Sequence, residues 1–296
     1  MNQVLGFVVN GSSLGAIYAL IALGFVMIFK ATAVMNFAHG SVVLLGAYVV
    51  GRTHDAVGFW VAVLLGLAAA AAGAALIDVI VLRRARRADP GTLAILTIGV
   101  NTLLSAELTR ELGSAILSTG APWGTSTVHL AGASIPLSRL VAAAVTVVVV
   151  AALWAAFRFS TWGISMRAAA EDGATAALMG IRLNRIAAGA WAIAGALAAL
   201  AGVFLTSFPS PGITPAVGVT ALAAIPAWVL GGFDSFPGAV AGGLIIGIVT
   251  ALTAGYQEHL LFLGRDLPQV APYAVMFLVL LIRPSGLFGS KEFTRV

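Results

Sequence analysis

The sequence predicts an all-α membrane protein, a polytopic bundle of transmembrane helices. Hydrophobic residues make up 60% of its 296 positions and charged residues only 9%, whereas a soluble protein carries about 25% charged residues. Uncharged stretches recur at 2–29, 56–77, 90–106, 140–157, 186–233 and 235–257. Because a helix needs about 20 apolar residues to cross the hydrocarbon core, several of these stretches are long enough to span. Barrel strands would instead be short and alternating.

The first half of the chain predicts a helix at about 10–30, in which Gly11 and Gly15 have the spacing of a close helix contact. A short segment at 36–50 follows. Further spans are expected at about 59–82, 92–112, 137–158 and 186–207.

A second short segment is expected at 217–231. Prolines precede it, and Pro226 interrupts it. The prolines before it are Pro209, Pro211 and Pro215. Beyond it, Gly238, Gly242, Gly243 and Gly247 predict another tight helix contact. Eight or nine membrane segments fit, because the short segments at 36–50 and 217–231 either cross fully or re-enter.

Basic residues set the orientation, since Lys and Arg are retained on the cytoplasmic side. With the N-terminus outside and the C-terminus inside, twelve of the sixteen face the cytoplasm, namely those at 30, 83, 84, 86, 87, 158, 167, 182, 185, 283, 291 and 295. These loops account for the net charge of +5, so no nucleic-acid partner is expected.

No catalytic constellation stands out in the sequence. Neither lysine, Lys30 or Lys291, follows the glycine of a phosphate-binding loop, so we expect no ATP site and no enzyme activity in this chain. The four histidines lack metal-ligand spacing, so no metal and no cofactor are expected. His54, His129 and His259 are read as loop residues.

Two carboxylates lie close to the expected helix ends. We expect Asp78 and Glu107 to pair with Arg83 and Arg110 at the membrane interface, in preference to a role in proton coupling. The tryptophans near span ends, Trp60, Trp123 and Trp154, are expected to be interfacial anchors.

The polar stretch 159–185 predicts two short helices, at 168–172 and 174–179. Gly173 permits a bend between them, and Gly180 suits a helix C-terminus. Such an element either inserts into a groove on a partner or lies on the membrane surface.

Both short membrane segments are expected to line a pathway, because broken helices expose backbone groups only where they border a cavity. The residues proposed for the pathway are Asn36, Phe37, His39, Gly40, Pro226, Gly231 and Gly232. The alternative is that Asn36 and His39 only cap the short helix and tie it to the first helix.

These segments together resemble the permease subunits of branched-chain amino acid ABC importers over nearly the whole chain. The resemblance rests on Asn-Phe-Ala-His-Gly at 36–40, on Arg167, Glu171, Asp172 and Gly180 with Ile181, and on the helix at 198–202. The glycine-rich turn at 231–238 and the closing Arg-Pro-Ser-Gly-Leu-Phe-Gly at 283–289 also fit. Residues 233–236, Phe-Asp-Ser-Phe, are bulkier than the family pattern.

The resemblance implies a single transmembrane permease domain, 1–296, whose loop 159–185 docks on a cytoplasmic ATP-binding subunit. It further implies a second homologous permease subunit, an extracytoplasmic substrate-binding protein and surrounding lipid, in the cell (inner or plasma) membrane of a bacterial type. The substrate would be a branched-chain or other small amino acid. The alternatives are a stand-alone secondary transporter or channel, and an ABC permease for urea, short amides or another small organic solute.

Overall fold

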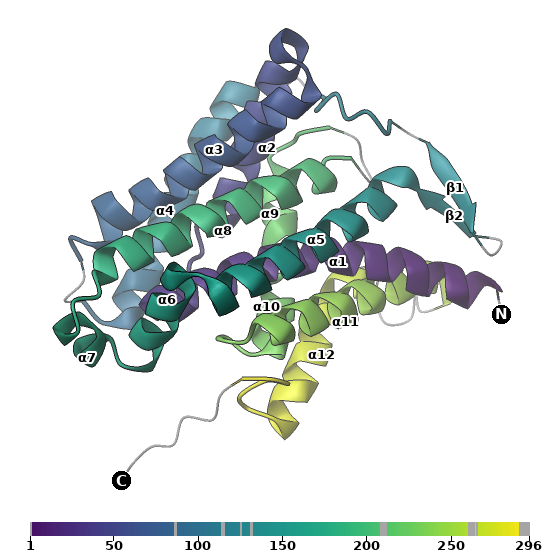
Figure 1. The fold of residues 1–296 in the computed structure, drawn as a ribbon. Helices are drawn as coiled ribbons and strands as arrows, with labels where there is room; N and C mark the ends of the chain where they lie inside the picture. The colour runs from purple at the N-terminus through teal and green to yellow at the C-terminus, as the bar shows by residue number, and fades with distance from the viewer. Residues whose placement is uncertain are drawn as a thin grey trace.

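The computed structural model describes residues 2–85, 88–113, 116–124, 126–130, 133–207, 212–259, 264 and 266–289. Its elements are helices, apart from one hairpin of two short strands (Figure 1). In chain order they are α1 (Asn2–Thr32), α2 (His39–Val57), α3 (Phe59–Leu76), the π-helical turn η1 (Ile77–Leu82), α4 (Pro90–Leu112), β1 (Thr127–Leu130), β2 (Ala133–Pro136), α5 (Leu137–Phe159), α6 (Thr161–Glu171), α7 (Gly173–Leu178), α8 (Leu183–Leu205), α9 (Ala216–Leu222), α10 (Ile225–Gly231), α11 (Phe236–Gly255) and α12 (Leu267–Ile282).

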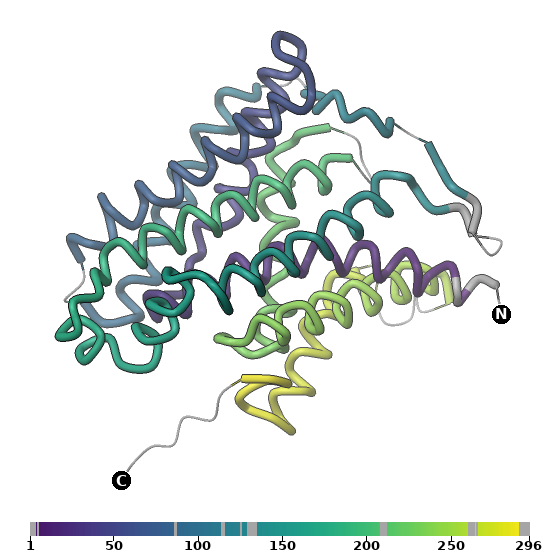
Figure 2. The backbone as a smooth tube through the Cα atoms, viewed as in Figure 1, coloured from purple at the N-terminus to yellow at the C-terminus, as the bar shows by residue number. Residues whose placement is uncertain are grey.

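Helix α1 is the core of the bundle. A helix that is apolar all round is one that is covered on every side, and nearly every residue of α1 between positions 16 and 28 is buried. Helices α5, α8, α10 and α11 pack around it, and the tube in Figure 2 shows α1 running through the middle of the molecule. The other helices are arranged around this axis.

Glycines let α1 and α11 approach closely. A Cβ atom added at Gly15 would lie 2.7 Å from the Cα of Leu244, and one added at Gly243 would lie 2.6 Å from the backbone nitrogen of Ala19. At Gly11 the nearest atom would be the Cα of Ile248, at 2.6 Å. The two predicted glycine contacts are confirmed, and they are the two sides of one interface.

The segment predicted at 36–50 is longer than expected, because α2 continues to Val57. Its last turns carry Arg52, His54 and Asp55, and His54 is 2.9 Å from the carbonyl of Gly51 and 3.1 Å from the carboxylate of Asp55. Charged residues therefore lie on the end of a helix here and not in a loop.

The second broken segment consists of two short helices, α9 and α10. The break falls at Ala223 and Ala224, before Pro226 and not at it. Proline suits the first turn of a helix, where no backbone N–H is needed, so Pro226 starts α10 instead of interrupting a helix. Pro209 and Pro211 lie outside the described residues.

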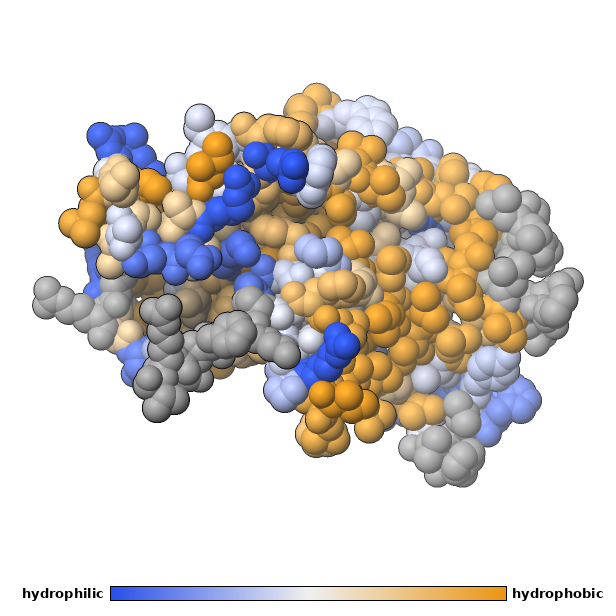
Figure 3. All heavy atoms as spheres, turned by 60° about the horizontal axis from the view of Figure 1, so that its bottom comes forward, coloured by the Kyte–Doolittle hydropathy of each residue, from blue (hydrophilic) through white to orange (hydrophobic). Residues whose placement is uncertain are grey.

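The outer surface is suited to lipid. Six helices of the described residues are long and apolar enough to cross a membrane: Gly6–Thr32, Phe59–Leu82, Pro90–Leu112, Leu137–Phe159, Leu183–Leu205 and Phe236–Gly255. On α4 and α5 only 11% and 17% of the residues in the apolar window are buried. Figure 3 shows hydrophilic side chains mainly at the end that holds α6 and α7, beside a broad apolar surface. The chain is therefore a multi-pass membrane protein.

Candidate functional site

The loop before α2 is a buried polar segment inside the bundle. Asn36 is 2% exposed, and its Oδ1 atom accepts a hydrogen bond of 3.0 Å from the backbone nitrogen of Ala38. This bond to the residue two positions on is an Asx-turn that leads into α2, whose N-cap is Ala38. Its Nδ2 atom has no partner among the described residues.

His39, the first residue of α2, is buried against α1. Its ring centre is 4.6 Å from that of Phe25, and a Cβ atom at Gly24 would lie 2.5 Å from the imidazole. The Nε2 atom has no partner within the described part of the chain, and the same holds for Nε1 of the fully buried Trp191 on α8. Buried polar atoms are normally hydrogen-bonded, so these three atoms retain capacity for water or a polar solute.

Helix α4 holds the loop from the other side. The hydroxyl of Thr97 accepts a hydrogen bond of 3.0 Å from the nitrogen of Phe37, and Oδ1 of Asn101 accepts one of 3.1 Å from the nitrogen of Ser41. Sequence reasoning missed both residues. The two residues are four positions apart and so lie on one face of the helix, but α4 carries other polar residues that do not distinguish this pair.

The proposed pathway residues form two groups in the structure. Gly40 packs against α9, because a Cβ there would lie 2.5 Å from the carbonyl oxygen of Gly218. Pro226, at the start of α10, is also buried. Gly231 and Gly232 instead contact the C-terminal turn, where the nitrogen of Phe288 donates to the carbonyl of Gly231 at 3.0 Å.

An aromatic column joins the two groups. The rings of Phe25 and Trp228 stack with centres 5.0 Å apart, and Nε1 of Trp228 donates to the carbonyl of Phe233 at 3.0 Å. Phe236 is also used in packing, since its ring centre is 4.4 Å from that of Phe157. The bulky residues at 233–236 thus fill the space between α1, α5 and α10.

The predicted polar stretch forms α6 and α7. The bend between them is at Asp172 and not at Gly173: its carboxylate caps α7, accepting from the nitrogens of Ala174 at 2.9 Å and Thr175 at 3.1 Å. A hydrogen bond from the Thr175 hydroxyl, together with these backbone bonds, holds the pKa of Asp172 below its ordinary value. Gly180 has φ +86°, as a helix C-terminus requires.

One side of this element is anchored and the other is free. On α6 the side chain of Met166 is fully buried, Gly163 lies against the carbonyl of Phe157, and Arg167 donates to that same carbonyl. At the end of α7, Leu178 and Met179 are 88% and 81% exposed. We call α6 and α7 together the coupling element.

A cavity of about 1110 Å³ opens beside the coupling element. It lies between the end of α1, α6, the start of α8 and the C-terminal turn, and its lining includes Lys30, Arg167, Glu171 and Asp234. Lys30 donates to the backbone carbonyl of Asp234 at 3.1 Å.

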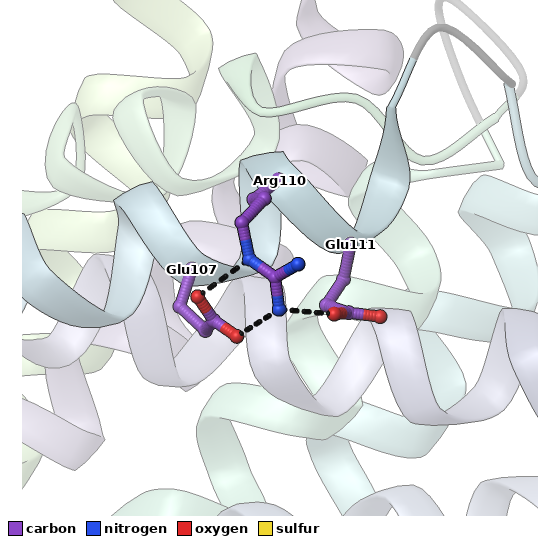
Figure 4. A network of polar contacts seen from close by, with 3 residues as sticks. All are labelled: Glu107, Arg110 and Glu111. Carbon is purple, nitrogen blue, oxygen red and sulfur yellow. Dashed lines mark hydrogen bonds and ion pairs between the residues drawn. The ribbon is translucent and has the colours of Figure 1, made fainter.

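Both predicted ion pairs are present. Arg83 is 3.1 Å from the buried carboxylate of Asp78. On α4, Arg110 lies between Glu107 and Glu111, at 2.6 and 2.5 Å, on an exposed surface (Figure 4). Among the described residues there is no group of three potential metal ligands.

Of the three tryptophans expected to be interfacial anchors, two are exposed and one is buried. Trp60 and Trp154 are exposed, whereas Trp123 is 7% exposed and stacks on Phe204 with centres 5.7 Å apart. Trp123 is therefore a packing residue, because the chain between α4 and β1 folds back over the end of α8.

The fold and this arrangement define a class, a helical membrane permease with a helical element exposed at one end. Residues 7–282 match the family described as branched-chain amino acid transport system, permease component. The chain belongs to this family, and the predicted function, the permease subunit of an ATP-binding cassette importer, is confirmed. Its family members are transporters and not enzymes.

Relatives match over almost the whole length. The chain is 34% identical to the high-affinity branched-chain amino acid transport system permease protein LivH of Escherichia coli K12, over 97% of this chain and 96% of that protein. It is 32% identical to the corresponding permease protein BraD of Pseudomonas aeruginosa, with the same coverage. A chain of the solved structure of PsaBC from Streptococcus pneumoniae in complex with Fab superposes with a TM-score of 0.51 at 14% identity, covering 93% of this chain and 91% of that chain, which shows the fold alone.

Proposed function

We propose that this chain forms one half of the translocation pathway for branched-chain amino acids, paired with a second homologous permease in the cell membrane. Cytoplasmic ATP-binding subunits dock on the coupling element, and an extracytoplasmic binding protein delivers the solute to the opposite end. The names of the relatives support the substrate class. The main observation in support of the docking of ATP-binding subunits is that the coupling element is anchored on one side and exposed on the other.

The orientation follows from charge. Of the described basic residues, eight lie toward the end with the coupling element, at 30, 83, 84, 158, 167, 182, 185 and 283, and three toward the other, at 52, 110 and 139. Since basic residues are retained in the cytoplasm, the coupling element is cytoplasmic, the N-terminus is outside and the C-terminus inside. Nine crossings satisfy this, with α2, the pair α9 and α10, and α12 added to the six long helices.

Docking of the ATP-binding subunit uses the exposed side of the coupling element. Met166 and Gly163 fix α6 to the bundle, so a force on α7 is passed to α5 and α8 instead of being lost in a loose loop. The exposed Leu178 and Met179 supply apolar contact area, and Glu171 supplies a carboxylate that accepts charge-assisted hydrogen bonds.

The docking test is a co-purification of this permease with its ATP-binding subunits. Glu171→Lys reverses an exposed charge, and we expect it to reduce both assembly and solute-stimulated ATP hydrolysis. Asp172→Asn removes a charge but keeps an acceptor for the α7 cap. This variant therefore tests the charge at the docking surface without unfolding the start of α7. Glu258→Lys, an exposed charge reversal at the other end, is the matched control for assembly. Normal assembly and hydrolysis in Glu171→Lys and Asp172→Asn would exclude this surface from docking.

The pathway is proposed to run beside residues 36–40 and α9. The uncompensated polar atoms of Asn36 and His39 support this, because a polar solute leaving water needs fixed dipoles. Asn36→Ser keeps a side-chain oxygen that can accept from the nitrogen of Ala38 in the same kind of turn, and it removes the amide donor. We expect Asn36→Ser and His39→Ala to lose leucine uptake while the complex stays assembled.

The result that would contradict this placement is normal uptake in both variants, or loss of uptake only where the complex falls apart. Competition of labelled leucine uptake with urea and acetamide tests the substrate class in the same vesicles. Uptake by the permease without ATP-binding subunits would favour a stand-alone transporter.

A further inference from the structure

The inner end of α3 is not an ordinary α-helix. In the turn η1 the backbone nitrogen of Arg83 donates to the carbonyl of Asp78 at 2.9 Å, a bond that spans five residues instead of four. Such π-helical turns are rare in helices and frequently lie at functional sites.

The wide turn brings together two side chains that an α-helix would separate. At 3.6 residues per turn, positions five apart point about 140° away from each other. In η1, by contrast, Nε and Nη2 of Arg83 are both 3.1 Å from Oδ2 of Asp78. The carboxylate is almost completely buried and the guanidinium is about a quarter exposed. The π-helical turn is therefore what permits this ion pair.

Arg83 also binds a second element. Its Nη2 atom donates to the backbone carbonyl of Asn184 at 2.7 Å. Asn184 is the second residue of α8 and comes only six positions after Leu178, the last residue of the coupling element. One guanidinium thus connects the inner end of α3 to the point where the coupling element joins α8.

Further along, the same two helices are in close contact. A Cβ atom at Gly195 of α8 would overlap the backbone of Ala70 on α3. Because interfaces this tight do not deform continuously, a displacement at the start of α8 has to move α3 with it.

We propose that Asp78 and Arg83 are positioning residues that transmit movement of the docked ATP-binding subunit from the coupling element into α3 and α8. Among the described residues, Arg83 is the cation that is paired with Asp78. The pair stays together during movement, because separation would leave the buried carboxylate of Asp78 uncompensated. The planar fork of arginine engages the carboxylate and the Asn184 carbonyl at once, which lysine does not reproduce. This inference rests on the proposed function.

The test measures leucine molecules taken up per ATP hydrolysed in vesicles that hold the complete complex. Asp78→Asn keeps the size of the side chain and removes its charge. Arg83→Lys keeps a cation beside Asp78 but lacks the fork. For both we expect the ratio to fall by at least about fivefold, the lower range of coupling between sites, while assembly stays at the wild-type level.

Glu107→Gln is the matched control, since it breaks a carboxylate–arginine pair on another membrane helix at the opposite, exposed end. Its ratio should equal that of the wild type. A wild-type ratio in both Asp78→Asn and Arg83→Lys, or a loss of uptake strictly proportional to lost complex, would overturn the inference. If the wild-type complex itself fails to couple ATP hydrolysis to leucine uptake, the proposed function fails instead.

Discussion

The contact between α1 and α11 predicts that a single methyl group destabilises the protein. Gly243→Ala places a Cβ atom 2.6 Å from the backbone nitrogen of Ala19, 2.7 Å from its Cα and 2.8 Å from its Cβ. Ordinary contacts of a Cβ atom begin at 3.4 Å. The nearest separation is therefore about 0.8 Å too short, and the helices have to move apart.

The size of the effect follows from two opposing contributions. Overpacking of a closely packed core costs about 1–3 kcal/mol, and the upper end applies because backbone atoms of α1 cannot rotate away as a side chain would. Alanine in place of glycine favours the helix by about 1 kcal/mol. We expect a net loss of about 2 kcal/mol in the free energy of unfolding.

The assay is thermal unfolding of the detergent-solubilised protein, followed by the fluorescence of its six tryptophans. By the relation for soluble domains of slightly smaller size, a loss of about 2 kcal/mol lowers Tm by roughly 4–8 °C. Gly99→Ala is the control, because that glycine lies in α4 with nothing within 4 Å of an added Cβ, and its Tm should stay or rise. A Gly243→Ala protein as stable as the wild type would refute the reasoning.

Three further predictions concern helix caps. Ser235→Ala removes the acceptor for the nitrogen of Gly238, 3.1 Å away, and should lower the free energy of unfolding by about 1 kcal/mol, measured by denaturant titration. The depressed pKa of Asp172 means that its cap stabilises α7 fully above about pH 5 and weakens as pH falls through and below 3.8, so the protection of 173–179 against hydrogen exchange, relative to the intrinsic rate at each pH, should fall only there. In Asp172→Asn that acid-dependent loss of protection should disappear. On α4, Asp89→Asn should likewise keep the cap on Thr92 at neutral pH, with Asp89→Ala fraying the first turn in hydrogen exchange.

The sequence was most informative where the signal is periodic or steric. The spans predicted at 59–82, 92–112, 137–158 and 186–207 match four of the long helices to within about three residues, because the bilayer fixes their length. The first helix was predicted too short, since α1 begins at Asn2 and not near position 10. The glycine spacings at Gly11 and Gly243 predict close helix contacts, because only glycine tolerates a backbone at that distance. The pairing of Asp78 with Arg83 was predicted as well.

What the sequence could not supply depends on contacts distant along the chain. Thr97 and Asn101 bind backbone groups some 60 positions away, and nothing in their own helix indicates that partner. The π-helical turn at Ile77–Leu82 was also missed, because residue propensities do not distinguish it from an α-helix. The bend at Asp172 was placed one residue late, since the capping carboxylate and not the flexible glycine decides it.

The central position of α1 has a consequence for biogenesis. Among the described helices α1 is synthesised first, yet its closest neighbour, α11, lies more than 200 residues later in the chain. Until α11 has been inserted, the glycine face of α1 meets only lipid or transient partners. Contacts between such distant segments form late. The bundle therefore closes around α1 only near the end of synthesis. A chain stopped before Phe236 lacks α11, the helix that covers the glycine face of α1.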